Sequence, residues 1–448
     1  MISLLKKYHG KAPRYTSYPT ANHFNSTVNE EVYRQWLLKF KEGEKVSLYI
    51  HIPYCQKLCW FCGCNTKIVN RYKPVQAYIQ RLEKEIETIA EILPEKLIAQ
   101  HLHFGGGSPN ILHHEDFSRL MRILHQKFTI EKNAEIALEV DPRTVSEEDI
   151  VHYAKEGVTR ISFGIQDTNP KVQHAINRIQ PYERIKEVVG YCRSQRIRKI
   201  NFDLIYGLPY QTPESITDTV DLISELHPNR ISFFGYAHVP LMKRHQRLLD
   251  EKSLPDSQLR FELCQRGTAR LLQKGYSQVG LDHFALPDDE IVVAHDEKKL
   301  QRNFQGYTTD TALTLLAFGA SAISRTADGY VQNAGNLKDY MDAIDHHRLP
   351  VARGIQITEE DRIRRRVIED LMCYLEVDLK LILSNYKIPL CFFSDELERL
   401  KKMEEDGVLM IKDYTIMIPK ENRTFVRSVC ALFDSYLPMK NAYHSSTI

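Results

Sequence analysis

Four of the nine cysteines in this 448-residue chain lie within ten positions, in the segment YCQKLCWFCGCNT at 54–66. Their spacing is Cys55-x3-Cys59-x2-Cys62-x-Cys64. Thiols so close together suit three kinds of chemistry: disulfide bonds, zinc binding or iron–sulfur ligation. The odd total and the lack of a secretory signal at the N-terminus predict a cytoplasmic protein with reduced thiols, which disfavours disulfides.

Zinc and iron–sulfur ligation differ in the cysteine pattern that they need. Zinc sites usually join CxxC pairs that a longer loop separates, whereas here all four cysteines share one short loop and no second pair follows nearby. Closely spaced thiolates on one loop can bind three irons of a [4Fe–4S] cubane and leave the fourth iron open for a ligand. We therefore expect a cluster, with a structural zinc loop as the alternative.

The elements that position this loop follow from an alternation of apolar runs and amphipathic helical stretches between Val46 and Tyr236. Alternation at this spacing indicates βαβ units and a parallel sheet. Six units predict an α/β fold, a partial (β/α)6 barrel, with a doubly wound sheet as the alternative. The expected strands are 46–53, 99–105, 134–140, 160–166, 199–207 and 230–237.

Each expected strand ends in, or is followed by, polar residues or a glycine-rich stretch. The carboxyl ends of parallel barrel strands meet at one face, so such residues favour one shared site. They are the cysteine loop, Gly105 to Pro109, Glu139 with Asp141, Gln166 with Asp167, Asp203, and Tyr236 to His238.

Composition and length limit the remaining possibilities. With 60 Lys and Arg against 58 Asp and Glu, the net charge of +2 gives no electrostatic case for a nucleic-acid partner. The longest uncharged run, 311–324, is too short to span a membrane. We expect an N-terminal arm at 1–45, the barrel at 46–290, and a mainly helical C-terminal domain at 291–448, where the alternation stops.

The CxxxCxxC spacing directly after the first strand resembles that of the radical S-adenosylmethionine (SAM) superfamily. Further strings extend the resemblance over nearly the whole chain, to the oxygen-independent coproporphyrinogen III oxidases (dehydrogenases). These strings are PRYTSYPT, YIHIPYCQKLCWFCGCN, HFGGGSPNIL, ALEVDPR, FGIQD, AINR, NFDLIYGLP, GYAHVP, GLDHFALPDDE, RNFQGYTT, GASAIS and VCALFDSYL.

The resemblance implies an oxidoreductase of haem biosynthesis that decarboxylates two propionates of coproporphyrinogen III to vinyl groups, giving protoporphyrinogen IX. It implies one [4Fe–4S] cluster, two S-adenosyl-L-methionine molecules per active site, and hydrogen abstraction by a 5′-deoxyadenosyl radical. An electron donor such as flavodoxin or ferredoxin and an unknown electron acceptor are the expected partners. We expect a monomer.

The same resemblance assigns roles to individual residues. Tyr49 and Cys64 are the expected catalytic residues, and the cluster ligands are Cys55, Cys59 and Cys62. The residues expected at the first SAM are Tyr49, Gly105, Glu139 and Ile323. Those expected at the second are Phe61, Gly106, Gly107, Gln166, Arg178, Asp203 and Ala237.

The substrate carries four carboxylates, so its pocket should offer cationic partners. Lys11, Arg14 and Arg302 are the candidates.

The chain departs from the family pattern at 312–317, where Ala317 stands in place of a common glycine, and at Gly235, which replaces a frequent asparagine. The alternative function is that of a haem chaperone of the same fold without dehydrogenase activity. Cys64, where chaperones typically carry phenylalanine, favours the enzyme.

Overall fold

The computed structural model describes residues 2–8 and 12–437, and it is built around one curved sheet. Six neighbouring strands of this sheet run parallel. This arrangement confirms the predicted partial barrel of six βα units. The strands are β1 (Lys45–Ile52), β4 (Ile98–Gly106), β5 (Thr129–Val140), β6 (Arg160–Gln166), β7 (Lys199–Tyr206) and β8 (Arg230–Gly235).

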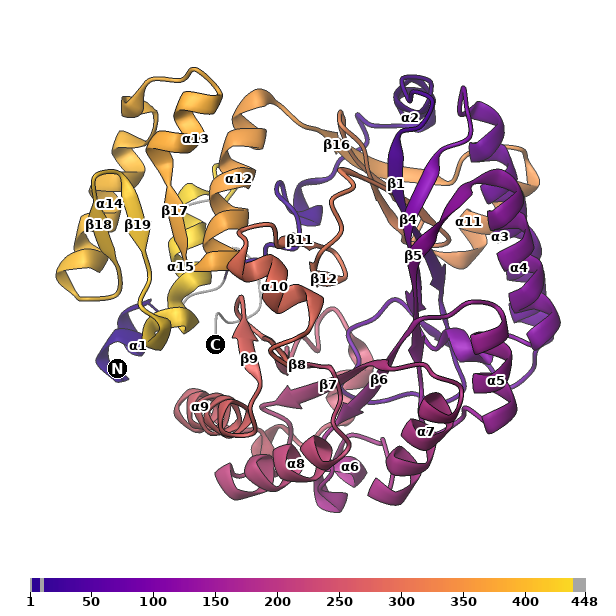
Figure 1. The fold of residues 1–448 in the computed structure, drawn as a ribbon, viewed down its shortest axis with the longest axis horizontal. Coiled ribbons are helices and arrows are strands. Elements are labelled where there is room, and N and C mark those ends of the chain that lie inside the picture. The colour runs from indigo at the N-terminus through magenta and orange to yellow at the C-terminus, as the bar shows by residue number, and fades with distance from the viewer. Residues whose placement is uncertain (1, 9–11, 438–448) are drawn as a thin grey trace.

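Helices cover the outer face of these strands (Figure 1). Their apolar stripes pack on the sheet in one continuous core, to which Ile79 of α3 and Leu120 of α4 belong. Local signals fix where helices begin: Ser146 caps α5 and Thr212 caps α8 through reciprocal capping boxes. The helices are α3 (Lys73–Ile92), α4 (His114–Lys127), α5 (Glu147–Lys155), α6 (Pro170–Ala175), α7 (Tyr182–Ser194), α8 (Pro213–Glu225) and α9 (Ser257–Gln273).

The sheet continues beyond the six parallel strands at both edges. Next to β1 lies β13, which is also parallel, and antiparallel strands follow it. Part of the chain after residue 290 thus joins the barrel sheet, while the division into domains at 45 and 290 stays a prediction. The added strands are β13 (Thr314–Phe318), β14 (Ile323–Arg325), β15 (Gly329–Asn333), β16 (Val351–Gln356), β10 (His283–Ala285) and β9 (Ser277–Val279).

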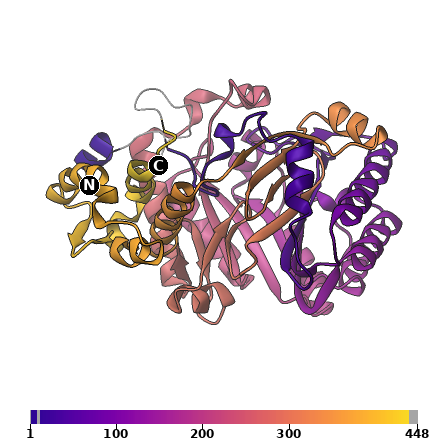
Figure 2. The ribbon, with the colours of Figure 1, turned by 90° about the horizontal axis from the view of Figure 1, so that it is seen from above.

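The C-terminal segment, residues 359–437, is mainly helical with one small sheet. The N-terminal arm packs against it, because Leu5, Tyr15 and Tyr18 belong to the core of this segment. In both views the helices of the C-terminal segment, together with α1, lie at the opposite end of the molecule from α3 and α4 (Figures 1 and 2). The elements are α1 (Ile2–Tyr8), α12 (Glu359–Tyr374), β17 (Glu376–Asp378), α13 (Leu379–Asn385), α14 (Ser394–Glu405), β18 (Met410–Lys412), β19 (Thr415–Met417) and α15 (Val426–Cys430).

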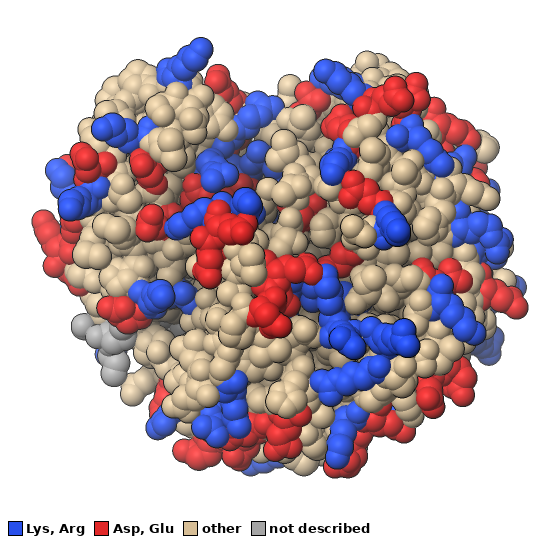
Figure 3. Space-filling view, viewed as in Figure 1, with Lys and Arg blue, Asp and Glu red and all other residues tan. Residues whose placement is uncertain are grey.

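Two smaller features complete the frame of the site. A short hairpin of β11 (Gln301–Asn303) and β12 (Gly306–Thr308) forms a separate two-stranded sheet. Acidic and basic side chains are interspersed over the face drawn in Figure 3. Within the described residues, none of the helices combines the length and apolar character needed to cross a bilayer.

Candidate active site

The cysteine loop lies between two short strands that follow β1, namely β2 (Tyr54–Cys55) and β3 (Lys67–Ile68). These strands pair in parallel and close the base of the loop. Two side chains from the segment after β8 hold the rest: His245 donates to the carbonyl of Cys62 at 2.7 Å, and Gln246 donates to that of Phe61 at 3.0 Å. The loop backbone is therefore fixed at its base and along its length.

Two arginines face the sulfur of Cys59, which is buried. Arg143 donates to this sulfur at 3.5 Å and Arg178 at 3.4 Å. Both arginines also pair with Asp141. Burial raises the pKa of Asp141, but Arg178 and Arg143 outweigh it and hold the pKa at about 2. A thiolate bound to iron is negatively charged, so two cationic donors at this sulfur suit a ligand cysteine.

The other cysteines of the loop also have polar neighbours. The sulfur of Cys55 lies 3.1 Å from the hydroxyl of Thr66, and the backbone N–H of Cys64 donates to the sulfur of Cys62 at 3.4 Å. All nine cysteines are free.

Zinc and a [4Fe–4S] cluster require different ligand arrangements. Among residues 2–8 and 12–437, no three Cys, His, Asp or Glu side chains are placed to hold a single metal ion. A zinc site needs its ligands around one ion. The thiolates of a cubane each bind a different iron, so their sulfurs lie further apart. The free thiols, the fixed loop and the arginines at Cys59 therefore fit a cluster.

The glycine run at the end of β4 brings backbone close to the cleft. A Cβ at Gly105 would lie 2.7 Å from Oε1 of Glu139 and 3.0 Å from the ring of Tyr49. Gly106 has φ +116°, a conformation that L side chains rarely adopt, and a Cβ there would lie 2.6 Å from His51. The N–H of Gly107 donates to a β1 carbonyl at 2.8 Å. The first two positions thus leave room only for glycine.

Glu139 ends β5 and accepts two hydrogen bonds. One comes from His103 at 3.0 Å and the other from the N–H of Gly106 at 3.1 Å. Burial raises the pKa of Glu139, but the bond from His103 and that from Gly106 outweigh burial and lower it. Glu139 is therefore an anion at neutral pH and can accept hydrogen bonds from a ligand.

Tyr49 lies on β1 beside the same cleft. Its hydroxyl is 3.0 Å from Nδ1 of His51, and its ring lies against that of His103. Burial, followed by the charge of Glu139, raises the pKa of Tyr49 well above 10, so the phenol keeps its proton. Burial lowers the pKa of His51 below 6.5, which keeps the imidazole neutral at pH 7.

A cleft of about 550 Å³ opens at the carboxyl ends of the strands and extends into the barrel. Asp203 reaches it from β7, where burial raises the pKa of this carboxyl although Asn201 donates to it at 2.9 Å. The cleft brings together about half of the predicted residues. They are Tyr49, Cys64, Gly106, Glu139, Asp203 and Ile323.

A second group of predicted residues lies around the cysteine loop, outside the lining of this cleft. Arg178 contacts Cys59, and its guanidinium also donates to the carbonyl of Gly164. Gln166 ends β6 with φ 67°. The carbonyls of Phe61 and Ala237 accept from the same side chain, Gln246. Arg178, Phe61 and Ala237 therefore border the loop rather than the barrel interior.

Two functional neighbours were missed in the sequence. Arg143 contacts Cys59, and its only sequence signal is its position two residues after Asp141 in ALEVDPR. His103 contacts Glu139, and the alternation of His101, His103 and Gly105 could have placed it on the cleft face of β4.

Comparisons with known proteins agree with this geometry. The family model "Radical SAM superfamily" matches residues 49–223. An oxygen-independent coproporphyrinogen III oxidase of Bradyrhizobium diazoefficiens is 43% identical over 438 residues, which cover 98% of this chain and 97% of the relative. The enzyme of the same name from Escherichia coli (strain K12) is 40% identical over 440 residues, covering 98% and 96%.

A solved structure extends the agreement to the fold. The Escherichia coli coproporphyrinogen III oxidase HemN, described as a radical SAM enzyme, superposes with a TM-score of 0.92 at 39% identity. The superposition covers 98% of this chain and 99% of the other. Likeness of this extent includes the arm, the barrel and the C-terminal segment together. The chain therefore belongs to the oxygen-independent coproporphyrinogen III oxidase family of radical SAM proteins.

Proposed function

We propose that this chain is a coproporphyrinogen III dehydrogenase, an oxidoreductase that converts two propionates of its substrate to vinyl groups without molecular oxygen. The product is protoporphyrinogen IX. The observation that carries this proposal is the 43% identity to an enzyme of that name over nearly the full length of both chains. The relatives reported above all carry the enzyme's name, so the haem-chaperone alternative has no support among them.

Cys55, Cys59 and Cys62 would hold the [4Fe–4S] cluster. The thiols that are free, and the arginine pair at Cys59, support this ligand set. When bound, the cluster and SAM supply the radical that abstracts hydrogen from the propionate side chain. Cys64 lies beside this trio and lines the cleft, which supports its proposed contact with the substrate.

Two sets of residues would hold the two SAM molecules. For the first SAM, Tyr49 offers a phenol, Gly105 offers backbone that a ligand can approach closely, and Glu139 offers a carboxylate, and these three residues lie next to one another. Ile323 lies on the wall of the cleft. For the second, Asp203 and Gly106 line the same cleft. The second set is completed at the cysteine loop by Phe61, Gly107, Gln166, Arg178 and Ala237.

The chain's own groups would bind and orient these molecules. Glu139 is ionised and can accept from an ammonium or a ribose hydroxyl. Tyr49 remains a protonated phenol and can donate a hydrogen bond or a proton at its hydroxyl oxygen. We further propose a monomer of the cytoplasm that receives electrons from a flavodoxin or ferredoxin and passes the electrons of the substrate to a separate acceptor.

An anaerobic assay tests the function. Reconstituted protein is incubated with coproporphyrinogen III, SAM and a reductant, and the porphyrins are separated after oxidation. We expect protoporphyrin to form only when SAM and reductant are both present. If the protein instead binds haem and leaves all four propionates of coproporphyrinogen III intact, the result would contradict the proposal and favour the chaperone alternative.

A further inference from the structure

A second, smaller cavity of about 110 Å³ lies between the barrel, the N-terminal arm and the C-terminal segment. Six cationic side chains line it, against two acidic ones, so its lining carries a net charge of about +4 with all groups ionised. We call it the arginine pocket. Its cationic residues are Arg14, Arg260, Arg302, Lys420, Arg423 and Arg427, and its acidic residues are Asp282 and Glu421.

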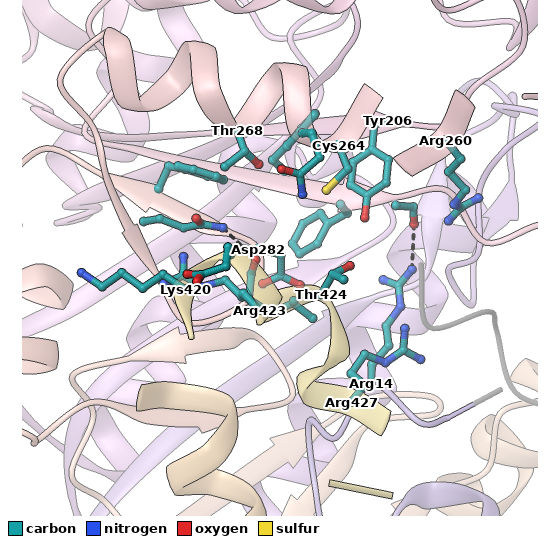
Figure 4. A pocket seen from close by; sticks show the side chains of 18 of the residues that line it. Arg14, Tyr206, Arg260, Cys264, Thr268, Asp282, Lys420, Arg423, Thr424 and Arg427 are labelled. Carbon is teal, nitrogen blue, oxygen red and sulfur yellow. Dashed lines mark hydrogen bonds between the residues drawn. The ribbon is translucent and has the colours of Figure 1, made fainter. Parts of the chain in front are cut away.

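The arginines reach the pocket from opposite sides (Figure 4). Arg260 comes from α9 beside Tyr206, while Arg14 of the arm and Arg427 of α15 approach from across the pocket. Room for Arg260 depends on Gly235, because a Cβ there would lie 2.7 Å from an Arg260 nitrogen. The same glycine's carbonyl accepts from Arg14 at 3.0 Å.

Several of the guanidinium N–H groups have no hydrogen-bond acceptor among the described residues. They are Nε of Arg260, Nε and Nη1 of Arg302, and Nε of Arg423. Arg302 is 5% exposed and Arg423 is 9% exposed. Burial without a partner is unfavourable for an ionised group. Burial also lowers the pKa of Arg423 to about 10.

The acidic groups in the pocket do not cancel this charge. Asp282 lies 3.8 Å from Nη1 of Arg302, outside hydrogen-bond distance, and it also accepts from His283. Two carboxylates beside six cations leave most of the positive charge uncompensated. Proteins retain such locally unfavourable groups chiefly where they bind something. An anion supplied from outside the chain would satisfy these donors.

The arginine pocket adjoins the active-site cleft. Phe234 lines both cavities. Consecutive residues divide between them: Asp282 and Arg302 line the pocket, while the next residues, His283 and Asn303, line the cleft. A ligand in the cleft could therefore extend a short side chain into the pocket.

We propose that the arginine pocket binds a propionate carboxylate of coproporphyrinogen III, one that is not reacting while it is bound there. This inference rests on the proposed function. The substrate carries four propionates and only two are decarboxylated, so others must be held during each reaction. A planar guanidinium suits a carboxylate in a two-pronged hydrogen bond, and the cavity has room for a group about as large as four water molecules.

Arg423→Met is the decisive variant, because it removes one unpartnered cation and keeps much of the side-chain volume. We expect KM for coproporphyrinogen III to rise about 10- to 100-fold, as for loss of a hydrogen bond to a charged group. We expect kcat and the Kd for SAM to stay the same, since binding is lost away from the reacting atoms. The melting temperature should be unchanged or higher, because a buried unpaired charge is removed.

Arg260→Met tests the opposite wall independently and should raise KM in the same way, so the proposal stays testable if one variant fails to fold. Lys412→Met, on the exposed strand β18, removes the same net charge and should leave KM unchanged. An unchanged KM in the folded pocket variants would overturn the inference, as would a general loss of SAM binding. No turnover by the wild-type protein would instead contradict the proposed function.

Discussion

Glu139→Gln isolates the negative charge that we place beside SAM. Glutamine keeps an oxygen to accept from the N–H of Gly106, whereas the carboxylate charge is lost. A hydrogen bond to a charged group contributes about 1.5–3 kcal/mol. The Glu139 side chain is 39% exposed, so water screens it and we expect about 1–2 kcal/mol. The Kd for SAM should rise about 5- to 30-fold.

The assay is equilibrium binding of labelled SAM to anaerobically reconstituted protein, together with iron content and melting temperature. Iron and melting temperature should remain close to the wild-type values. Glu135→Gln is the matched control, because Glu135 lies on the same strand and lines the same cleft but pairs with the buried Arg160 at 2.9 Å. It should lower the melting temperature and leave SAM affinity unchanged. Equal SAM affinity in Glu139→Gln and wild type would refute the assignment.

Three further predictions concern stability and the cluster. Burial raises the pKa of Glu85 from 4.5 to about 7, so the folded state binds more protons across that window and loses about 3 kcal/mol of stability as pH rises through it. Thermal unfolding at about pH 5 and about pH 8 should show this loss in wild type and not in Glu85→Gln. Gly106→Ala should lower both melting temperature and SAM affinity, more than Gly43→Ala does, because Gly43 shares a positive φ but has nothing within 4 Å. Serine at Cys55, Cys59 or Cys62 should abolish bound iron, while Cys64→Ser should retain it. Iron loss from Cys64→Ser alone would contradict the assignment of these three cysteines as the cluster ligands.

Much of the fold could be predicted because its signals are local. Each of the six parallel strands is an apolar run followed by a helix, and all six were placed in the sequence. The strands after residue 290 were missed, since β14 has only three residues and β13 pairs with β1, which lies far away in the sequence. No periodic pattern can appear in so short a segment.

The site divides in the same way. The cysteine loop and the glycine run are contiguous in sequence, so their spacing was informative. Arg14 and Arg302 were proposed as substrate contacts, and both line the arginine pocket; Lys11, the third candidate, lies outside the described residues. Arg260 and Arg423 were missed, because they lie 163 positions apart in the numbering and only the packing of the C-terminal segment on the barrel brings them together.

The stoichiometry of the reaction directly tests the proposal that a 5′-deoxyadenosyl radical abstracts hydrogen from each of two propionates. Each vinyl group requires one hydrogen abstraction, so we expect about two 5′-deoxyadenosine molecules for each protoporphyrinogen IX formed under anaerobic conditions. Both products can be quantified from the same quenched reaction by chromatography. A ratio near two, dependent on added coproporphyrinogen III, is the predicted result. SAM cleavage without any protoporphyrinogen IX, or product formed without 5′-deoxyadenosine, would contradict the proposed dehydrogenase function.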